Sequence, residues 1–156
     1  MIRSSTPLDK PSILEMIEAS GHFDSDAVQF VQNQLEHHFD IGGRGIWLTA
    51  DDGEVVGVAH CNPEPLADGT WNLLMLWTKP GKHRQGYGTA LVRHVVDHLK
   101  TEGARLLIVE TSGVEAFEQA RAFYAKCGFQ LEARIHNFFA VGDDKLVFTM
   151  ALPSSA

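Results

Sequence analysis

One stretch of the chain, residues 79 to 89, combines glycines with basic side chains and has the residue types that bind phosphate. Its sequence is KPGKHRQGYGT, and it follows an apolar segment and opens an amphipathic one. The start of a helix offers unpaired backbone N–H groups and the positive end of the helix dipole, which together bind anions. Gly86 and Gly88 let these N–H groups approach an anion because no Cβ is in the way. The stretch therefore predicts a phosphate site, although an ordinary strand-to-helix turn would use the same glycines.

Two common phosphate loops do not fit this stretch. A dinucleotide fingerprint G-x-G-x-x-G would need a third glycine where the chain has Leu91. A nucleotide P-loop would need Gly-Lys-Ser or Gly-Lys-Thr after four spacer residues, and this is absent. Lys79, Lys82 and Arg84 nevertheless supply local positive charge. We therefore expect a phosphate-bearing ligand other than those that these two loops bind. A nucleotide-binding α/β module remains an alternative.

The other reactive side chains form no second catalytic arrangement. Cys61 and Cys127 lack metal-ligand spacing and are expected to be reduced, partly buried thiols. Six of the eight histidines share no ligand spacing with a carboxylate or a cysteine. A Ser-His-Asp or Cys-His arrangement is not supported either. The sequence therefore predicts no metal site.

Composition and charge indicate a soluble domain and argue against nucleic-acid and membrane partners. A length of 156 residues with 44% hydrophobic and 21% charged residues suits one soluble domain, residues 1–156. The net charge of −7 argues against a general nucleic-acid partner, which would require a basic face. No apolar run approaches the roughly 20 residues of a membrane span, and the first residues do not resemble a secretory signal. We therefore expect a cytoplasmic protein that binds no membrane.

Apolar periodicity and turn residues predict the elements that must position these groups. The predicted order is strand, two helices, three strands, helix, strand, helix and two strands, which indicates an α/β fold with one mixed sheet. The predicted strands are 1–4, 46–50, 55–61, 71–78, 106–110, 129–138 and 145–152. The predicted helices follow Thr6, span 25–38, begin near Gly86, and span 115–126.

The glycine-rich stretch resembles the acetyl-CoA pyrophosphate loop of the GNAT superfamily. The family pattern is Q/R-x-x-G-x-G/A, placed six residues after a proline, and Pro80, Gly86 and Gly88 stand at that spacing. His83 departs from the pattern, because the family has Gln or Arg there. A second block, ARAFYAKCGF at residues 120–129, is similar to the family's helix ending A-x-x-F-Y-x-K-x-G-F. Phe117 stands where the family often has an asparagine.

The resemblance implies a GNAT-like fold in which the fourth and fifth strands splay apart and the pantetheine arm of acetyl-CoA lies between them. Tyr124 aligns with the family tyrosine that protonates the departing coenzyme A thiolate, a role that suits a phenol with a pKa of roughly 10. A backbone N–H near the splay would stabilise the oxyanion. The implied cofactor-binding residues are Leu76, Trp77, Thr78, His83, Arg84, Gln85, Gly86, Tyr87, Gly88, Thr89, Phe123 and Lys126.

An attacking amine must lose a proton, so the reaction requires a base or a water relay. Glu110 is the first candidate because it ends the strand beside the splay, and a structural role for its carboxylate is the alternative. His60 on a preceding strand could serve instead, although a lone strand histidine is more often packing. Asp143 and Asp144 could attract a cationic acceptor, but Gly-Asp-Asp is also a common turn, which we expect here.

The resemblance predicts an acetyl-CoA-dependent N-acetyltransferase that transfers the acetyl group directly to a primary amine of a small molecule, amino acid or peptide. A catalytically silent acyl-CoA-binding sensor or interaction domain is the alternative. One subgroup of uncharacterised bacterial members has WDLYW where residues 71–75 read WNLLM, so the acceptor is not predicted. Dimers are common among relatives, and a homodimer is an expectation by analogy alone.

Overall fold

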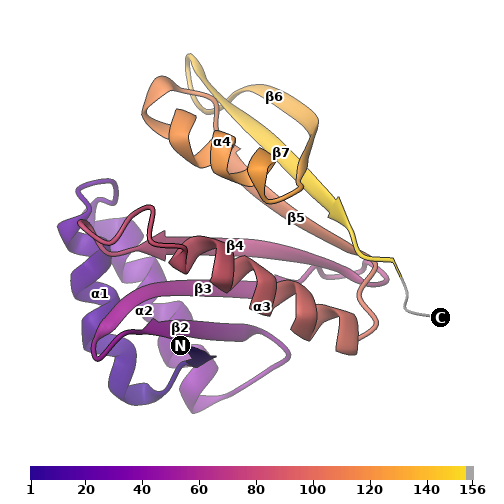
Figure 1. The fold of residues 1–156 in the computed structure, drawn as a ribbon. Helices are drawn as coiled ribbons and strands as arrows, with labels where there is room; N and C mark the ends of the chain where they lie inside the picture. Colours follow the sequence, from indigo (N-terminus) through magenta and orange to yellow (C-terminus); the bar gives the residue numbers. More distant parts are fainter. Residues whose placement is uncertain (154–156) are drawn as a thin grey trace. The chain divides into compact units, whose positions relative to one another are not determined.

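The computed structural model describes residues 1–153, which form seven strands and four α-helices (Figure 1). The strands are β1 (Ile2–Ser4), β2 (Ile46–Asp51), β3 (Val55–Pro63), β4 (Thr70–Thr78), β5 (Leu106–Ser112), β6 (Gln130–Ala140) and β7 (Asp143–Ala151). The helices are α1 (Lys10–Ala19), α2 (Ser25–Asp40), α3 (Tyr87–Thr101) and α4 (Glu118–Lys126), with short 3₁₀ turns at Pro7–Asp9 and Glu115–Phe117. The hydrogen-bonded strand order is β1-β2-β3-β4-β5-β7-β6. The predicted element order and mixed α/β class are confirmed.

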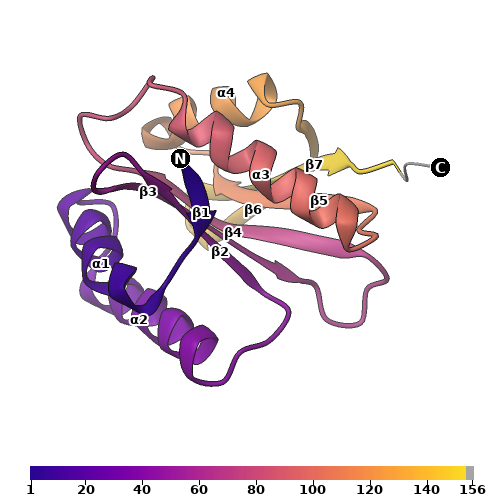
Figure 2. The ribbon, with the colours of Figure 1, turned by 60° about the horizontal axis from the view of Figure 1, so that its bottom comes forward.

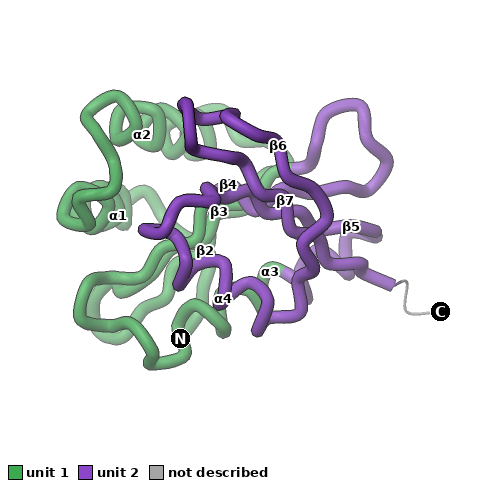
Figure 3. Tube along the Cα trace, turned by 90° about the horizontal axis from the view of Figure 1, so that it is seen from above, with its two compact units in different colours: residues 1–62, 75–95 green, residues 63–74, 96–156 purple. Residues whose placement is uncertain are grey.

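The chain divides into two compact units, which Figure 3 colours separately. The first unit comprises residues 1–62 and 75–95, and the second comprises residues 63–74 and the chain from residue 96 onward. Strand β4 and helix α3 each contribute residues to both units.

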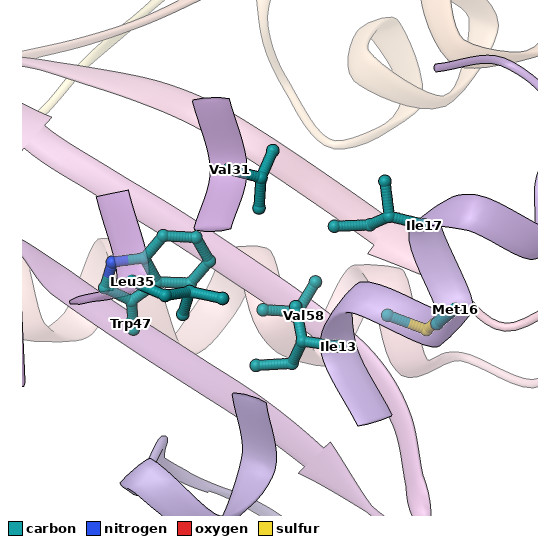
Figure 4. Packing of buried hydrophobic residues seen from close by; sticks show 7 residues of the cluster. All are labelled: Ile13, Met16, Ile17, Val31, Leu35, Trp47 and Val58. Carbon is teal, nitrogen blue, oxygen red and sulfur yellow. The ribbon is translucent and has the colours of Figure 1, made fainter. Parts of the chain in front are cut away.

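In the first unit, helices pack on both faces of the β2–β3 hairpin (Figure 2). The cross-strand pairs Trp47↔His60 and Thr49↔Val58 share one face, because directly opposed residues point the same way. That face packs against α1 and α2 in a buried apolar cluster (Figure 4). Its members are Ile13, Met16, Ile17, Val31, Leu35, Trp47 and Val58.

The opposite face of the hairpin contacts the first half of α3 through a close approach at Gly57. A Cβ at Gly57 would lie 3.1 Å from Leu91 Cδ1 and 3.3 Å from Ala50 Cβ. Leu91 is fully buried there. Glycine at this position therefore allows α3, the helix that follows the glycine-rich stretch, to pack directly on β3.

In the second unit, the first half of β4 pairs in parallel with β5, joining Thr70–Leu73 to Leu106–Val109. Antiparallel pairing then links β5 to β7 and β7 to β6. Helix α4 packs on this layer through Tyr124, whose ring lies 5.8 Å from that of Phe129 and 6.1 Å from that of Phe148. The helix ends where Gly128 adopts a φ of +102°, which favours glycine.

Several element boundaries differ from the sequence-based expectation, and three of the differences have a clear structural basis. The first helix starts with a 3₁₀ turn because the Asp9 carboxylate accepts hydrogen bonds from the Thr6 N–H at 2.8 Å and from the Arg3 guanidinium. Strand β5 continues to Ser112, since residues 111 and 112 pair with β7. The expectation that Asp143 and Asp144 form a turn was wrong, because both belong to β7 and the turn is made by residues 141 and 142.

Candidate active site

The glycine-rich stretch forms an exposed loop between β4 and α3 in the first unit. The Lys79 N–H donates to the Val56 carbonyl at 2.8 Å, and the Lys82 N–H donates to the Lys79 carbonyl at 2.9 Å. These two bonds tie the beginning of the loop to β3 and close a turn. The rest of the loop, residues 83–86, is exposed to solvent.

Left-handed backbone conformations shape the end of this loop. Arg84 has a φ of +64° and Gly86 a φ of +86°. Residues in the left-handed region turn backbone N–H groups toward a common concavity, which is a recurrent way to bind an anion. A non-glycine residue with positive φ is strained, and such strain gathers at functional loops. Gly86 immediately precedes Tyr87, the first residue of α3, so the loop leads into a helix start.

Two predicted cofactor-binding side chains fold back on the loop itself. His83 Nε2 lies 3.3 Å from the Thr78 carbonyl oxygen, and Gln85 Nε2 donates to the Gly81 carbonyl at 3.4 Å. Thr89 in the first helical turn is exposed. The loop can therefore offer backbone N–H groups to a phosphate while these side chains support its shape.

The predicted cofactor-binding segment Leu76–Thr78 ends β4 and is half-buried. The Trp77 ring packs edge-on against Phe23 at 5.3 Å and against His22 at 5.5 Å. Its indole Nε1 is buried and has no hydrogen-bond partner within residues 1–153. Pairing of this segment with a pantetheine arm stays a prediction.

Tyr124 lies in α4 of the second unit and is 8% exposed. Burial raises the pKa of its phenol to about 12, so the hydroxyl keeps its proton throughout the neutral pH range. Phe123 packs against it with ring centroids 5.7 Å apart, and Lys126 is exposed at the end of the same helix. The hydroxyl is thus in the form that a proton donor requires.

Glu110 lies on β5 of the second unit, where it forms an ion pair that sequence reasoning missed. Its Oε2 atom is 2.8 Å from Lys145 Nζ, and that ammonium also lies 4.1 Å from the centroid of the Phe138 ring. Lys145 is opposite Ser112 in the β5–β7 register, two residues from Glu110. The pairing therefore follows from strand register, which the sequence alone does not specify.

His60 is a buried, neutral ring in the first unit. Its Nδ1 donates to the Ile46 carbonyl at 3.1 Å, and the ring stacks on Trp47 at 3.9 Å with an interplanar angle of 10°. Burial lowers the pKa of His60 to about 4. A ring that holds a proton this weakly is a poor base toward an ammonium group with a pKa of about 10. His60 is therefore a weaker candidate for the base than its sequence position indicated.

The predicted residues fall into two groups that the two units hold separately. The loop, Leu76–Thr78 and His60 belong to the first unit, and Glu110, Phe123, Tyr124 and Lys126 belong to the second. Within the described residues, no group of three or more His, Cys, Asp or Glu side chains is arranged to hold a metal ion. No helix in residues 1–153 is long and apolar enough to span a membrane.

Sequence reasoning also missed the side chains that contact the glycine-rich loop between β4 and α3. The turn between β2 and β3 supplies two carboxylates, Asp52 and Glu54, that bind loop residues. The only local signal is the acidic sequence Asp51-Asp52-Gly53-Glu54, which by itself indicates no more than a turn between two strands.

Comparison with known proteins identifies relatives of the whole chain. The model of the family described as acetyltransferase (GNAT) matches residues 13–129. A crystal structure of a Desulfovibrio desulfuricans protein assigned to the GNAT acetyltransferases has a TM-score of 0.93 and 28% identity, covering 98% of this chain and 99% of that one. No curated protein is significantly similar in sequence.

Two further solved structures share the fold at lower identity. The ribosomal-protein-S18-alanine N-acetyltransferase of Escherichia coli has a TM-score of 0.78 at 22% identity, covering 100% of this chain and 95% of that one. The YncA protein of Salmonella typhimurium, solved with its cofactor acetyl-CoA, has a TM-score of 0.80 at 17% identity with the same coverage.

Proposed function

The chain belongs to the acetyltransferase (GNAT) family, and we propose that it transfers an acetyl group from acetyl-CoA directly to a primary amine. The acceptor class is a small molecule, an amino acid or a peptide. The E. coli relative is named for a protein alanine acceptor, which supports an amine but does not identify the one used here. We further propose that the two units act together as one catalytic domain in the cytoplasm.

The loop between β4 and α3 is the observation that carries this proposal. Residues 83–86 are exposed, the backbone has positive φ at Arg84 and Gly86, and Tyr87 starts a helix of 15 residues. Such a loop presents N–H groups and a helix dipole to an anion, and the pyrophosphate of coenzyme A is the anion that the family resemblance implies. Lys79 and Lys82 lie on the same loop and supply positive charge.

The proposed reaction forms one bond and breaks one bond. The neutral amine nitrogen attacks the thioester carbon, a tetrahedral oxyanion forms, and collapse breaks the C–S bond to release the thiolate. Tyr124 donates a proton toward that sulfur, because its phenol is protonated throughout the neutral range. Glu110, directly or through water, accepts the proton that the amine loses. A backbone N–H near the end of β4 stabilises the oxyanion.

The ion pair between Glu110 and Lys145 favours a second candidate function. A carboxylate already bound to an ammonium has a structural role to fulfil, which supports an acyl-CoA-binding domain without turnover. Tyr124 favours the enzyme, since the chain retains a phenol at the position where the resemblance implies a general acid. Measured turnover distinguishes the two candidates.

Calorimetric titration with acetyl-CoA, with NAD and ATP as controls, tests the cofactor. We expect selective micromolar binding of acetyl-CoA, and a folded sample that binds none of it refutes the proposal. An amine screen that follows thiol release then tests catalysis. Preferential binding of NAD or ATP would instead support a nucleotide-binding module.

Tyr124→Phe tests the acid. Removing one hydroxyl should lower kcat by about 100-fold, in the range of general acid catalysis, with little change in the Kd for acetyl-CoA. The chain has two tyrosines, so Tyr87→Phe is the matched comparison, and any effect there should appear in Kd rather than in the chemical step. Equal turnover of Tyr124→Phe and the unchanged protein would remove Tyr124 from the mechanism.

A further inference from the structure

Two side chains of the turn between β2 and β3, Asp52 and Glu54, make three contacts with the glycine-rich loop and the helix start that follows it. Glu54 Oε2 lies 2.7 Å from Lys79 Nζ, and Asp52 Oδ2 lies 3.8 Å from Lys82 Nζ. The Tyr87 hydroxyl donates a hydrogen bond of 2.7 Å to the same Asp52 oxygen. All of these residues belong to the first unit.

These contacts change the charge that the loop presents to an anion. Lys79, Lys82 and Arg84 carry three positive charges, and Asp52 and Glu54 carry two negative charges beside them. The formal charge of this group is therefore +1 rather than +3. An approaching phosphate is attracted by the lysines and repelled by the carboxylates, and both effects act within the screening length of about 8–10 Å.

We propose that Asp52 and Glu54 compete with the phosphates of coenzyme A for Lys82 and Lys79, and so lower the affinity of the protein for acetyl-CoA. This inference rests on the proposed function, because it concerns the same loop. Each lysine must loosen its carboxylate contact to bind a phosphate oxygen. Glu54 has the shorter contact, at 2.7 Å, and is expected to compete more strongly than Asp52 through its lysine.

The competition acts equally on the product. Coenzyme A carries the same phosphates as acetyl-CoA, so a weaker attraction at the loop also shortens the time that the product stays bound. Product release limits the turnover of many enzymes. The acidic turn therefore favours release of coenzyme A after transfer, at the expense of affinity for the donor.

Asp52 has a second contact, which should raise the affinity for acetyl-CoA rather than lower it. Its hydrogen bond to Tyr87 holds the first residue of α3, so losing it would loosen the helix start and weaken phosphate binding. If positioning dominated, neutralising Asp52 would lower the affinity rather than raise it. Within residues 1–153, Glu54 bonds Lys79 and makes no hydrogen bond to Tyr87, so its neutralisation changes the charge without loosening the helix start.

The experiment is a titration of acetyl-CoA into the full chain and three variants at low ionic strength. Glu54→Gln and Asp52→Asn each remove one negative charge and nearly preserve side-chain shape. Asp51→Asn is the matched control, because Asp51 ends β2 next to the turn and its carboxylate binds Arg3 and the Gly53 N–H, each at 3.0 Å, but no loop lysine. We expect Glu54→Gln to tighten acetyl-CoA about two- to fivefold, the range typical of exposed ion pairs, and Asp51→Asn to change it less.

Added salt and a second substitution test whether charge causes any gain in acetyl-CoA affinity by Glu54→Gln. The gain should vanish near 1 M salt, where the screening length is about 3 Å. It should also vanish when Lys79→Met is combined with Glu54→Gln, because the freed lysine is then absent. Unchanged or weaker binding by Glu54→Gln, while the unchanged protein binds acetyl-CoA, overturns this inference alone. Failure of the unchanged protein to bind acetyl-CoA overturns the proposed function as well.

Discussion

Acidification should destabilise this protein through His60. The ring is 5% exposed, stacks on Trp47, and uses its Nδ1–H to bond the Ile46 carbonyl. Burial is the main cause of its low pKa, which falls from an ordinary 6.5 to about 4, and the nearby positive charge of protonated His38 adds to it. Protonating the ring therefore places a charge in an apolar layer that has no carboxylate against it among these contacts.

The sign and size of the effect follow from proton linkage. The folded-state pKa lies below the unfolded value, so the unfolded chain binds more protons between pH 6.5 and 4. The contribution of His60 is fully present above pH 6.5 and is lost as the pH falls toward 4. At about 1.4 kcal/mol per pH unit, the loss is about 2 kcal/mol by pH 5 and about 3 kcal/mol by pH 4. That is a substantial part of the 5–15 kcal/mol that typically stabilises a domain.

Urea denaturation between pH 7.5 and 4, followed by tryptophan fluorescence, measures this loss. His60→Asn is the comparison, since the Asn amide can still donate to the Ile46 carbonyl but does not titrate. Asp9 and other groups with shifted pKa values titrate in both proteins, so the difference between the two pH profiles isolates His60. We expect the unchanged protein to lose about 3 kcal/mol more than the variant on going to pH 4.

Parallel pH profiles for the two proteins would refute this reasoning. If His60→Asn does not fold, the ring can be titrated directly in the unchanged protein by NMR. A His60 pKa near 6.5 would then show that burial does not penalise its charged form. A pKa near 4 would confirm the physical cause.

Two further substitutions test how the fold positions the loop and the first helix. Gly57→Ala places a methyl group 3.1 Å from Leu91 Cδ1 and 3.3 Å from the Trp77 carbonyl, so overpacking should cost about 1–3 kcal/mol in thermal denaturation, and unchanged stability would mean that α3 can shift. Asp9→Asn weakens two hydrogen bonds from Arg3, at 2.8 and 2.9 Å, at a carboxylate that is 5% exposed. It should destabilise the protein by about 1–3 kcal/mol at pH 7 and by less near pH 3, because Arg3 lowers the pKa of that carboxyl and its contribution disappears with protonation.

Local patterns in the sequence were sufficient to predict the fold, because apolar spacing and turn residues within a few positions indicate most of the helices and strands. The apolar spacing of α3 and the glycines at 86 and 128 mark element boundaries within one or two residues of those observed. The two family blocks did more, since they predicted the family, which the match over residues 13–129 confirms. The phosphate-binding role of the turn and the acid role of Tyr124 stay predictions.

The charged contacts of the glycine-rich loop and of Glu110, which the sequence did not reveal, join residues far apart in the chain. Tyr87 and Asp52 are 35 residues apart, and Lys79 and Glu54 are 25 apart. The Glu110–Lys145 pair likewise depends on the register between β5 and β7. Charged residues at such separations have no periodicity of their own, so only the folded chain shows which of them meet.

One set of interactions holds the glycine-rich loop between β4 and α3 in place, and another determines its net charge. Buried contacts determine where its backbone lies: the Lys79 N–H bonds the Val56 carbonyl, and α3 packs onto β3 at Gly57. Exposed side chains on the β2–β3 turn determine its net charge, and exposed ion pairs contribute little to folding stability. Substitutions at Asp52 and Glu54 should therefore change coenzyme affinity while leaving the melting temperature nearly constant. Gly57→Ala should instead lower the melting temperature, and any shift of α3 that it causes should weaken coenzyme binding as well. The charge of the loop can thus vary without a loss of stability, whereas its position cannot.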